Sequence, residues 1–431
     1  MDLKPSLYNR YVPGAVDDGW VLFNRFWGSL AVLDQAQARL VQHHRLSQLP
    51  VTTLHELHDA GFVVDAGTDE IAAAHERYLA HRHGNEQLAL TVELTQDCNL
   101  ACPYCYQNPY RSAGTVTAED IGHLVAYAER LITAQARPIT GIALRFIGGE
   151  PLLRRHILLD TTRQVRCLAV RLGVGANVQA DTNGLLLNEE IVSALDATSV
   201  TITNRADHDR MRIRRNGRGT YDALLGRLAR LAECYNAHET VLAVRFNVNA
   251  DNADLVADTY RAVKTLGIRY TQFDIFPMVN HPGNRSVGVL SREDFGRLFL
   301  DVVTLKLDFG EIVRDFPRPA FSPCSAYTPY NVKITASGGL TLCDALTSAR
   351  GEVAALAGPG FAPQDLFPDV AGYDPFLDPM CGRCPDIGIC GGRIACRQEP
   401  CDFLPFDMDE FLRLLVRELP HHPDRFILAK D

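Results

Sequence analysis

Residues 88–105 read LALTVELTQDCNLACPYC. The first seven residues, Leu88–Leu94, are mostly apolar and have the length of a buried β-strand. Three cysteines follow closely, at Cys98, Cys102 and Cys105. A strand that runs into a cysteine-rich loop predicts a metal site at the carboxyl end of a sheet.

Strand and helix patterns alternate from this stretch to about residue 310. The predicted strands are Leu88–Leu94, Gly141–Phe146, Asn177–Asp181, Val200–Thr203, Val241–Val248 and Tyr270–Phe276. The amphipathic helices predicted between them include Ala118–Thr133, His156–Leu172, Tyr221–Ala237 and Ala253–Leu266. Six such repeats indicate an α/β fold with a parallel sheet and helices outside it. A partial (β/α)6 barrel and an open doubly wound sheet both fit this pattern.

The patterning divides the chain into three expected domains. Residues 1–87 combine short strands, Trp20–Phe23 and Ser29–Val32, with helices, and they suggest a winged-helix-like module. Residues 88–310 form the strand–helix domain. Residues 311–431 are rich in Gly, Pro and Cys and end in an amphipathic helix, Met408–Leu419. Metal ligation would supply the cohesion that this loop-rich part lacks.

Composition narrows the class of protein. The 431 residues carry a net charge of −9, with 46% hydrophobic and 22% charged residues, as in an ordinary globular protein. We expect a cytoplasmic protein, since we find neither a signal peptide nor a membrane span. The acidic balance argues against a nucleic-acid partner. The twelve cysteines indicate metal ligation rather than disulfides, because they are clustered and cytosolic thiols stay reduced.

The spacing Cys98-x3-Cys102-x2-Cys105 suits an iron–sulfur centre. Three thiolates can hold three irons of a [4Fe–4S] cluster, which leaves the fourth iron open to a small chelating molecule. The alternative is a structural zinc site, but zinc usually takes four ligands in paired spacing, and no second pair lies nearby. Cys167 and Cys234 stand alone in helical patterns and are expected to be buried hydrophobes.

The stretch Cys98-Asn99-Leu100-Ala101-Cys102-Pro103-Tyr104-Cys105 resembles the signature of the radical S-adenosylmethionine (radical SAM) superfamily. This resemblance implies a TIM-like partial barrel in which S-adenosylmethionine chelates the open iron. It also implies reductive cleavage to a 5′-deoxyadenosyl radical that abstracts hydrogen from a substrate, with an external electron donor of the flavodoxin or ferredoxin type. The backbone near Tyr104 is expected to contact the adenine.

Three further motifs at strand ends are predicted to bind the cofactor. Gly148, Gly149 and Glu150 follow the second strand; the glycines permit close approach of a ligand, and the carboxylate suits an ammonium group. They are similar to the family motif for the methionine amine. Thr182 and Asn183 end the third strand, where a turn and a binding role are both reasonable, and the resemblance favours binding. The segment Ser199–Thr203 resembles the strand whose last hydroxyl, here Thr203, binds the cofactor carboxylate.

Several basic side chains have two interpretations. Residues 205–218 contain six arginines, which usually form a solvated face, although one of them could pair with a carboxylate of the cofactor or of an acidic substrate. Arg245 and Asn247 lie on the fifth predicted strand and could point into the barrel; a structural hydrogen-bonding role is equally expected.

The seven remaining cysteines resemble a SPASM domain, a C-terminal extension with two auxiliary [4Fe–4S] clusters. That resemblance assigns Cys381, Cys384, Cys390 and Cys401 to an outer cluster and Cys324, Cys343 and Cys396 to an inner one. A zinc ribbon is the alternative, because CxxC pairs are common zinc ligands. Asp344 matches the position of the substrate base in sulfatase maturases, so it is a candidate base or else a solvated turn residue.

The substrate hypothesis follows from residues 1–87. Tyr11, Trp20–Asn24 and the helix at Asp34 are reminiscent of modules that bind the leader of a ribosomally made precursor peptide by adding it as a strand to a sheet edge. The leading hypothesis is therefore an enzyme that modifies a precursor peptide by oxidative cross-linking. The alternatives are a sulfatase- or quinoprotein-type protein maturase and a non-enzymatic iron–sulfur or zinc protein.

Overall fold

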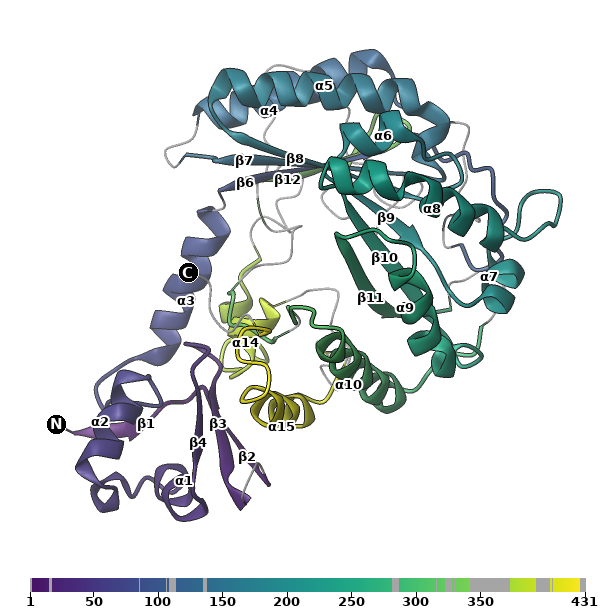
Figure 1. The fold of residues 1–431 in the computed structure, drawn as a ribbon. Coiled ribbons are helices and arrows are strands. Elements are labelled where there is room, and N and C mark those ends of the chain that lie inside the picture. The colour runs from purple at the N-terminus through teal and green to yellow at the C-terminus, as the bar shows by residue number, and fades with distance from the viewer. Residues whose placement is uncertain are drawn as a thin grey trace. The chain divides into compact units, whose positions relative to one another are not determined.

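The structure is a computed structural model (Figure 1). It describes residues 2–14, 18–84, 86–105, 107, 114–134, 138–280, 287–314, 316–321, 328, 330–341, 373–392, 404 and 406–426. Within these residues the chain forms two compact units. One unit consists of the described parts of Met1–Gly84, Ser291–Cys324 and Gly372–Asp431, and the other of those of Asn85–Leu290 and Ser325–Ala371.

The second unit is built on an eight-stranded sheet in the order β11-β10-β9-β8-β7-β6-β12-β13. Six of its parallel strands follow one another in the chain: β6 (Gln87–Glu93), β7 (Gly141–Ile147), β8 (Gly175–Thr182), β9 (Ala197–Thr201), β10 (Val241–Val248) and β11 (Thr271–Pro277). These are the six strands that the sequence predicts, and each begins and ends within three residues of its predicted bounds.

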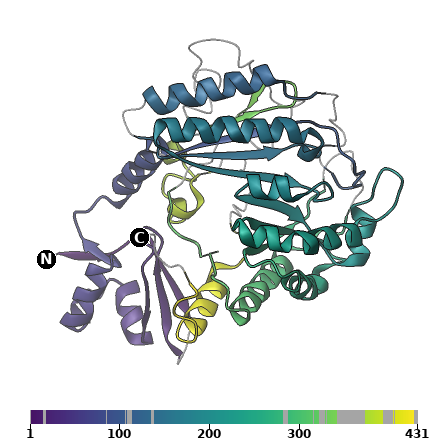
Figure 2. The same ribbon diagram turned by 45° about the horizontal axis from the view of Figure 1, so that its top comes forward.

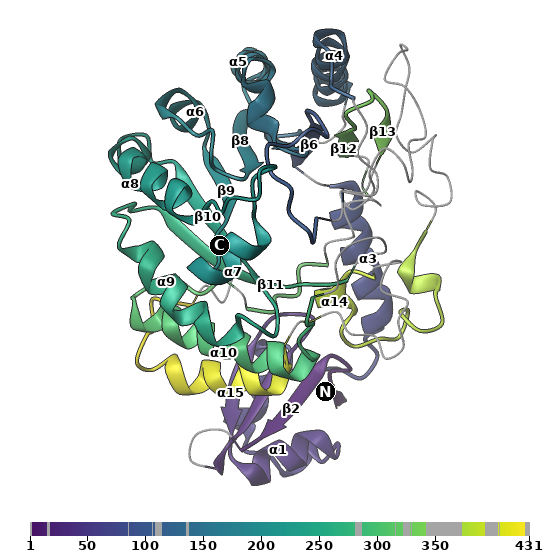
Figure 3. The same cartoon turned by 90° about the vertical axis from the view of Figure 1, so that its right-hand side faces the viewer.

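Helices cover the outer face of this sheet. They are α4 (Ala118–Ala134), α5 (Arg155–Leu172), α6 (Glu189–Ala194), α7 (Arg205–Met211), α8 (Tyr221–Ala237) and α9 (Val256–Lys264), with short 3-10 turns η4 (Pro151–Arg154) and η5 (Ala253–Leu255). The strands fan out in a curve, with α4, α5, α6 and α8 along one side (Figure 3), and the two long blue helices lie over the same face in Figure 2. Helices on one face of a curved sheet identify the partial barrel and rule out the doubly wound alternative, which needs helices on both faces.

Alternation along the strands separates the packed face from the open one. On β10, Leu242, Val244 and Phe246 are at most 1% exposed and pack under the helices. The residues between them, including Arg245 and Asn247, point to the other face. The barrel therefore presents polar side chains on its inner side.

Two strands at the β6 edge are absent from the sequence prediction. They are β12 (Asn331–Ile334), which is parallel to β6, and β13 (Leu340–Thr341), which is antiparallel to β12. Both come from the loop-rich third segment. They are short, and the buried Lys333 interrupts the apolar pattern of β12. The predicted helix Ala253–Leu266 is also shorter than expected, since its first turn is the 3-10 helix η5.

The first unit contains the N-terminal elements together with C-terminal helices. The N-terminal strands are β1 (Leu3–Pro5), β2 (Asn9–Pro13), β3 (Trp20–Asn24), β4 (Leu30–Leu33) and β5 (Val63–Asp65). The helical elements are α1 (Gln35–Gln42), η2 (Leu46–Gln48), α2 (Val51–Asp59), α3 (Glu70–His83), α10 (Arg292–Asp308), η7 (Pro375–Leu377), α14 (Ile387–Cys390) and α15 (Met408–Glu418). Strands β2, β3 and β4 make an antiparallel sheet, and β1 pairs with β5.

One apolar core joins the two ends of the chain in this unit. Val12 and Phe23 of the N-terminal sheet are fully buried and belong to the same cluster as Phe411 and Leu415 of α15. The ring of Phe23 meets Phe316 edge-on, with centroids 5.4 Å apart. The N-terminal sheet is therefore packed against residues of the C-terminal segment. No helix among the described residues has the length and hydrophobicity needed to cross a membrane.

Candidate active site

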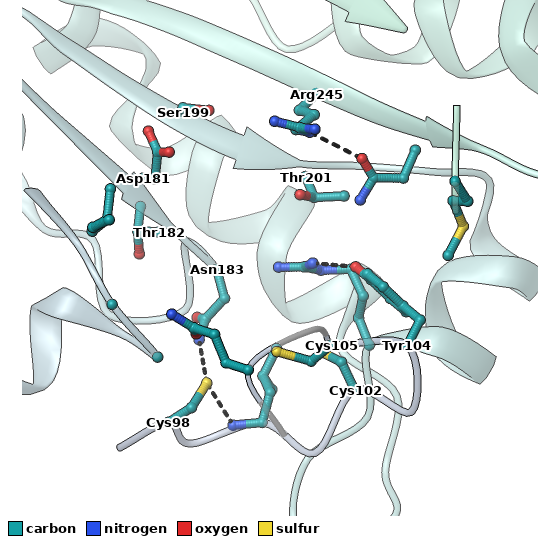
Figure 4. A pocket seen from close by; sticks show the side chains of 18 of the residues that line it. Cys98, Cys102, Tyr104, Cys105, Asp181, Thr182, Asn183, Ser199, Thr201 and Arg245 are labelled. Atoms are coloured by element: carbon teal, nitrogen blue, oxygen red, sulfur yellow. Dashed lines mark hydrogen bonds between the residues drawn. The ribbon is translucent and has the colours of Figure 1, made fainter. Parts of the chain in front are cut away.

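A cavity of about 350 Å³ opens at the carboxyl ends of the parallel strands, where barrels of this kind carry their chemistry. Figure 4 shows the side chains that line it. The cavity is lined by Cys98, Leu100, Cys102, Tyr104, Cys105, Gln107, Arg145, Ile147, Gly148, Gly149, Asp181, Thr182, Asn183, Ser199, Thr201, Arg212, Arg245, Asn247, Pro277, Met278 and Val279. The structure thus brings the three cysteines together with most of the predicted cofactor residues.

The cysteine loop is held by short-range bonds and by a distant arginine. Cys98 donates its backbone N–H to the Asp97 carboxylate at 3.0 Å, and the Leu100 N–H donates to the Cys98 sulfur at 3.4 Å. Arg215 donates from Nε to the Cys98 carbonyl at 3.0 Å and forms an ion pair with Asp97. Ala101 bonds to the backbone of Ile213 at 2.8 Å. These bonds fix the backbone of the cysteine loop through contacts within the protein.

The thiols suit a cluster better than a single ion. Cys98 and Cys102 are buried, Cys105 is half-buried, and none of the three is in a disulfide. Among the described residues, no group of three His, Cys, Asp or Glu side chains is placed to hold one metal ion. A [4Fe–4S] cluster takes each thiolate on a different iron, so it does not need the three sulfurs to converge on one point.

The glycine loop after β7 presses against the cysteine loop. Gly148 has a φ of +146°, and a Cβ at this position would lie 2.3 Å from the Thr95 carbonyl oxygen. A Cβ on Gly149 would lie 2.4 Å from the Asp97 carbonyl oxygen. The Gly149 N–H also donates to Thr95 O at 2.8 Å. Both glycines are thus required by contact between two backbone segments, in addition to any ligand.

Glu150 lies behind the cavity wall and does not line it. Its carboxylate is fully buried and accepts hydrogen bonds from Thr182 Oγ1 at 2.7 Å, from Asn183 N at 2.7 Å and from Leu152 N at 3.0 Å. Burial raises the pKa of Glu150, and these donors oppose the rise. In this structure the carboxylate joins the ends of β7 and β8, so its predicted contact with the cofactor amine stays a prediction.

Thr182 and Asn183 both line the cavity. The Asn183 side chain donates to Asn99 Oδ1 at 2.6 Å and lies 3.9 Å from the Cys98 sulfur. The Thr182 hydroxyl also accepts from Gly184 N at 3.0 Å, so it combines a turn with a place at the site. The two interpretations of this motif are therefore compatible.

Thr203 is not among the residues that line the cavity. Strand β9 ends at Thr201, two residues earlier than predicted, and the chain turns away before Thr203. The Thr203 hydroxyl is buried and has no hydrogen-bond partner among the residues that the structure describes. Ser199 and Thr201 line the cavity instead. The same alternation that selects Thr203 also selects these two residues; the predicted end of the strand was two residues too late, and the contact of Thr203 with the cofactor stays a prediction.

The arginine-rich segment is only partly a solvated face. Arg212 lines the cavity and donates from Nη1 to the Tyr104 hydroxyl at 2.7 Å. Burial raises the pKa of Tyr104, so the phenol stays protonated and accepts this bond. Arg212 and Arg215 thus connect this segment to the cysteine loop, whereas Arg205 pairs with the exposed Asp222.

The wall opposite the cysteines carries charged residues, of which the sequence singled out Arg245 but neither Arg145 nor Asp181. Arg145 of β7 pairs with Asp181 of β8 at 2.5 Å. Arg245 lies over the ring of Phe276, with its guanidinium carbon 3.8 Å from the ring centroid. Period-two alternation from the buried residues of each strand would have found Arg145 and Asp181, because both are inward-facing positions.

The C-terminal cysteines are only partly described. Cys381, Cys384 and Cys390 lie in the first unit and are not in disulfides, and Cys390 ends the short helix α14. The Cys384 N–H donates to the Cys381 carbonyl at 3.0 Å, which makes a tight CxxC turn. Cys324, Cys343, Asp344, Cys396 and Cys401 lie outside the described residues. Contrary to expectation, Cys167 is exposed on α5 and Cys234 is half-buried.

The donor set therefore fits a three-cysteine cluster with one open iron and an adjoining polar cavity for a small molecule. A site of this kind at the carboxyl end of a partial barrel is the arrangement that the sequence resemblance to the radical SAM superfamily predicts. The family described as the Radical SAM superfamily matches residues 92–261 of this chain.

Curated relatives match limited parts of the chain. A GTP 3′,8-cyclase of Synechococcus sp. is 36% identical over 128 residues, which is 28% of this chain and 34% of the relative. A serine-type anaerobic sulfatase-maturating enzyme of Klebsiella aerogenes is 27% identical over 48% of this chain and 50% of its own length. The PqqA peptide cyclase of Gluconobacter oxydans is 26% identical over 43% and 50%. The chain spans half or less of each of these relatives.

Solved structures extend the likeness of fold. The enzyme anSMEcpe with bound AdoMet and Kp18Cys peptide has a TM-score of 0.57 at 16% identity, covering 78% of this chain and 98% of that one. Streptococcus suis SuiB bound to S-adenosylmethionine has a TM-score of 0.50 at 14% identity, covering 94% and 99%. At sequence identities this low, the structural likeness shows a shared fold alone.

Proposed function

We propose that this chain is a radical SAM enzyme that abstracts hydrogen from a residue of a ribosomally made precursor peptide. The observation that carries the proposal is a single cavity lined by three cysteines, a glycine loop and the polar ends of strands β8 and β9. When bound there, a reduced [4Fe–4S] cluster and S-adenosylmethionine supply a carbon-centred radical that takes a hydrogen atom from the substrate.

The residues of this chain have distinct tasks in that proposal. Cys98, Cys102 and Cys105 would hold three irons. The backbone at Gly149 and the side chains of Thr182 and Asn183 would bind the methionine part of the cofactor. Ser199 and Thr201 would offer hydroxyls to its carboxylate. The Arg212–Tyr104 bond would fix the loop beside the adenine and help to exclude water.

The central test is cofactor cleavage by cysteine variants. The protein is purified anaerobically and loaded with iron and sulfide, and 5′-deoxyadenosine is measured after reduction. Replacing Cys98, Cys102 and Cys105 with Ala should abolish the product. Cys167→Ala is the matched control, because Cys167 is exposed on α5 far in sequence from every predicted cluster. Continued cleavage by the triple variant would disprove the assignment.

The peptide substrate is supported by relatives that act on peptides by name. PqqA peptide cyclase is one of them, and anSMEcpe was solved with a peptide bound. Cross-linking also removes electrons, and two auxiliary clusters on the seven later cysteines would accept them, with Asp344 as the candidate base. A fully loaded chain should then contain about twelve irons, four for each cluster. A measured content of about four irons per chain would disprove the proposal of two auxiliary clusters.

Leader recognition is assigned to the edge of the N-terminal sheet. Among the described residues, strand β4 pairs with β3 alone, and Val32 on this edge is 48% exposed. Because Asn24 N donates to Ser29 O, the ladder alternates so that the Val32 N–H points away from β3. That N–H is free to pair with an added peptide strand.

A proline at this edge tests leader binding without removing the module. Val32→Pro deletes the outward N–H and leaves the hydrogen bonds between β3 and β4 intact. Val32→Thr is the control, because threonine keeps the outward N–H. A leader peptide that binds the wild-type protein should bind at least about tenfold more weakly to the proline variant, because one backbone hydrogen bond is lost and its neighbours are disturbed. Equal binding of the peptide to both variants would exclude the β4 edge as the leader-binding site.

The second candidate is a maturase of a sulfatase-type protein, favoured by the match to the Klebsiella enzyme. In that case a segment of the target protein would be modified without a leader. Activity that is indifferent to Val32→Pro on a substrate without any leader would favour this candidate over the first.

A further inference from the structure

Gln107 lines the cavity two residues after Cys105, the last cysteine of the triad. Only 6% of the residue is exposed, so protein encloses most of its amide group. The side-chain NH2 group donates from Nε2 to the Glu93 carboxylate at 3.2 Å. Among the described residues, none donates to the carbonyl oxygen Oε1, and this oxygen keeps access to the cavity. Gln107 therefore offers the cavity a hydrogen-bond acceptor.

Glu93 determines which end of the Gln107 amide is offered. On β6 it alternates with Leu90 and Val92, which are fully buried under the helices, so its side chain points to the inner face of the barrel. There the buried carboxylate accepts twice, from Gln107 at Oε1 and from the backbone N–H of Ala336 at Oε2, both at 3.2 Å. A carboxylate only accepts hydrogen bonds, so Gln107 must keep its NH2 group turned toward Glu93.

The bond to Ala336 shows to which part of the barrel Gln107 belongs. Ala336 lies in the turn between β12 and β13, on the sheet edge beside β6. Cys343 and the candidate base Asp344 follow β13 closely in the sequence. The predicted contact with adenine is made elsewhere, by the backbone near Tyr104. We therefore expect the substrate, and not the adenine, to meet Gln107.

We propose that the Gln107 carbonyl oxygen, oriented by Glu93, accepts a hydrogen bond from an amide N–H of the peptide substrate. This inference rests on the proposed function and deepens it, because it gives the chain a residue that orients the substrate backbone beside the cluster. Every residue except proline carries this donor. The subsite therefore selects against proline at the substrate position that meets Gln107.

A purely structural role is the main competing explanation. Gln107 and Glu93 would then only tie the cysteine loop to β6 and to the turn after β12. That role predicts no discrimination between ligands with and without an N–H. The adenine amino group of the cofactor is the other possible source of an N–H donor, and a separate measurement distinguishes it.

The test compares two small amides on the full chain, loaded anaerobically with iron and sulfide and in the presence of S-adenosylmethionine. N-methylacetamide carries the N–H of a peptide bond, and N,N-dimethylacetamide replaces it with a methyl group. Dissociation constants are measured by ligand-observed NMR. Wild-type protein should bind N-methylacetamide about fivefold more tightly, the usual effect of one net hydrogen bond. Equal binding of the two amides would overturn the proposal.

Replacing Gln107 localises the preference. Gln107→Leu should remove it, because leucine has a similar size and no acceptor. Gln164→Leu is the matched control and should keep it, because this glutamine lies on α5 and bonds to Asp160 outside the cavity. A preference that survives Gln107→Leu would overturn the proposal.

Replacing Glu93 tests the orientation of the amide. In Glu93→Gln the new carbonyl oxygen can stay on the Ala336 N–H while the new NH2 group faces Gln107, which then rotates and turns its own NH2 group to the cavity. This variant should lose the preference and bind N,N-dimethylacetamide about fivefold more tightly than wild type does, a gain that a structural role would not produce. A folded variant without that gain would overturn the orienting role. Denaturant midpoints verify folding, and if Glu93→Gln does not fold, Gln107→Leu decides alone.

The source of the donor is resolved by the affinity for S-adenosylmethionine, measured by equilibrium dialysis for wild type and Gln107→Leu. Unchanged cofactor affinity together with a lost amide preference would support the proposal. A fivefold loss of cofactor affinity, with equal binding of the two amides to wild type, would assign the oxygen to the adenine and overturn it. If wild type shows the preference but forms no 5′-deoxyadenosine, the proposed function fails while the amide subsite stands.

Discussion

Replacement of Glu150 by Gln tests whether this buried carboxylate acts by positioning its neighbours. One carboxylate oxygen accepts from Thr182 Oγ1 and Leu152 N, and the other accepts from Asn183 N at 2.7 Å. A glutamine can keep the first pair only by turning its NH2 group toward the Asn183 N–H. Two donors then face each other in a buried site, where one unsatisfied donor costs about 1–3 kcal/mol.

Removing the buried charge offsets part of this cost. We therefore expect the free energy of local opening at Asn183, which protects its amide from hydrogen exchange, to fall by about 2 kcal/mol. Since 1.4 kcal/mol corresponds to tenfold, hydrogen exchange of the amides at 183–185 should accelerate about thirtyfold. Glu150→Ala, which leaves three donors unsatisfied, should accelerate it further. Glu190→Gln is the control, because Glu190 is exposed on α6. Unchanged exchange at Asn183 in Glu150→Gln would refute the positioning role.

Three further outcomes can be measured. Gly149→Ala should reduce S-adenosylmethionine binding at least tenfold, because the new Cβ would lie 2.4 Å from a backbone oxygen. Gly122→Ala is the control, because its Cβ would meet open space. It should stabilise α4 by about 0.5–1 kcal/mol in denaturant unfolding. Burial lowers the pKa of His208 to about 3, so the folded state disfavours its protonation. Its contribution to stability is present above about pH 6.5 and falls by up to about 1.4 kcal/mol per unit as the pH drops toward 3. His208→Gln should lessen this acid sensitivity, and the same change at the exposed His238 should not. Arg215→Gln should cost less than about 1 kcal/mol in unfolding, since Arg215 is 62% exposed, yet should hasten iron loss to a chelator because the Cys98 carbonyl loses its donor.

The sequence was sufficient to predict strands β6 to β11, because each has the length and the apolar pattern of a buried parallel strand. It was insufficient for β12, where four residues with a buried Lys333 carry no periodic signal. The pairing of β12 with β6 joins segments more than 200 residues apart, and only the folded chain reveals it. Local patterns therefore predicted the repeating part of the sheet and not its added edge.

The site shows a similar division. The cysteine loop is recognisable because cysteine is rare and its spacing is specific. The predicted strand that ends at Thr203 has the correct alternation but extends two residues too far, and Thr201 at its observed end lines the cavity. The bond from Arg212 to Tyr104 depends on contact between two loops that the sequence does not relate. The positioning of Glu150 likewise depends on donors from the next strand.

The core that unites Phe23 with Phe411 affects how the chain is made. The strand–helix barrel is nearly continuous in sequence and can fold as it leaves the ribosome. The N-terminal sheet is synthesised first, but its apolar face is fully covered only after α10, the segment around Phe316 and finally α15 have emerged. At roughly 5–20 residues per second this delay is on the order of 20–80 seconds. During that interval the nascent chain exposes Val12, Phe23 and their neighbours, so its yield in cells should depend on chaperones that cover this face.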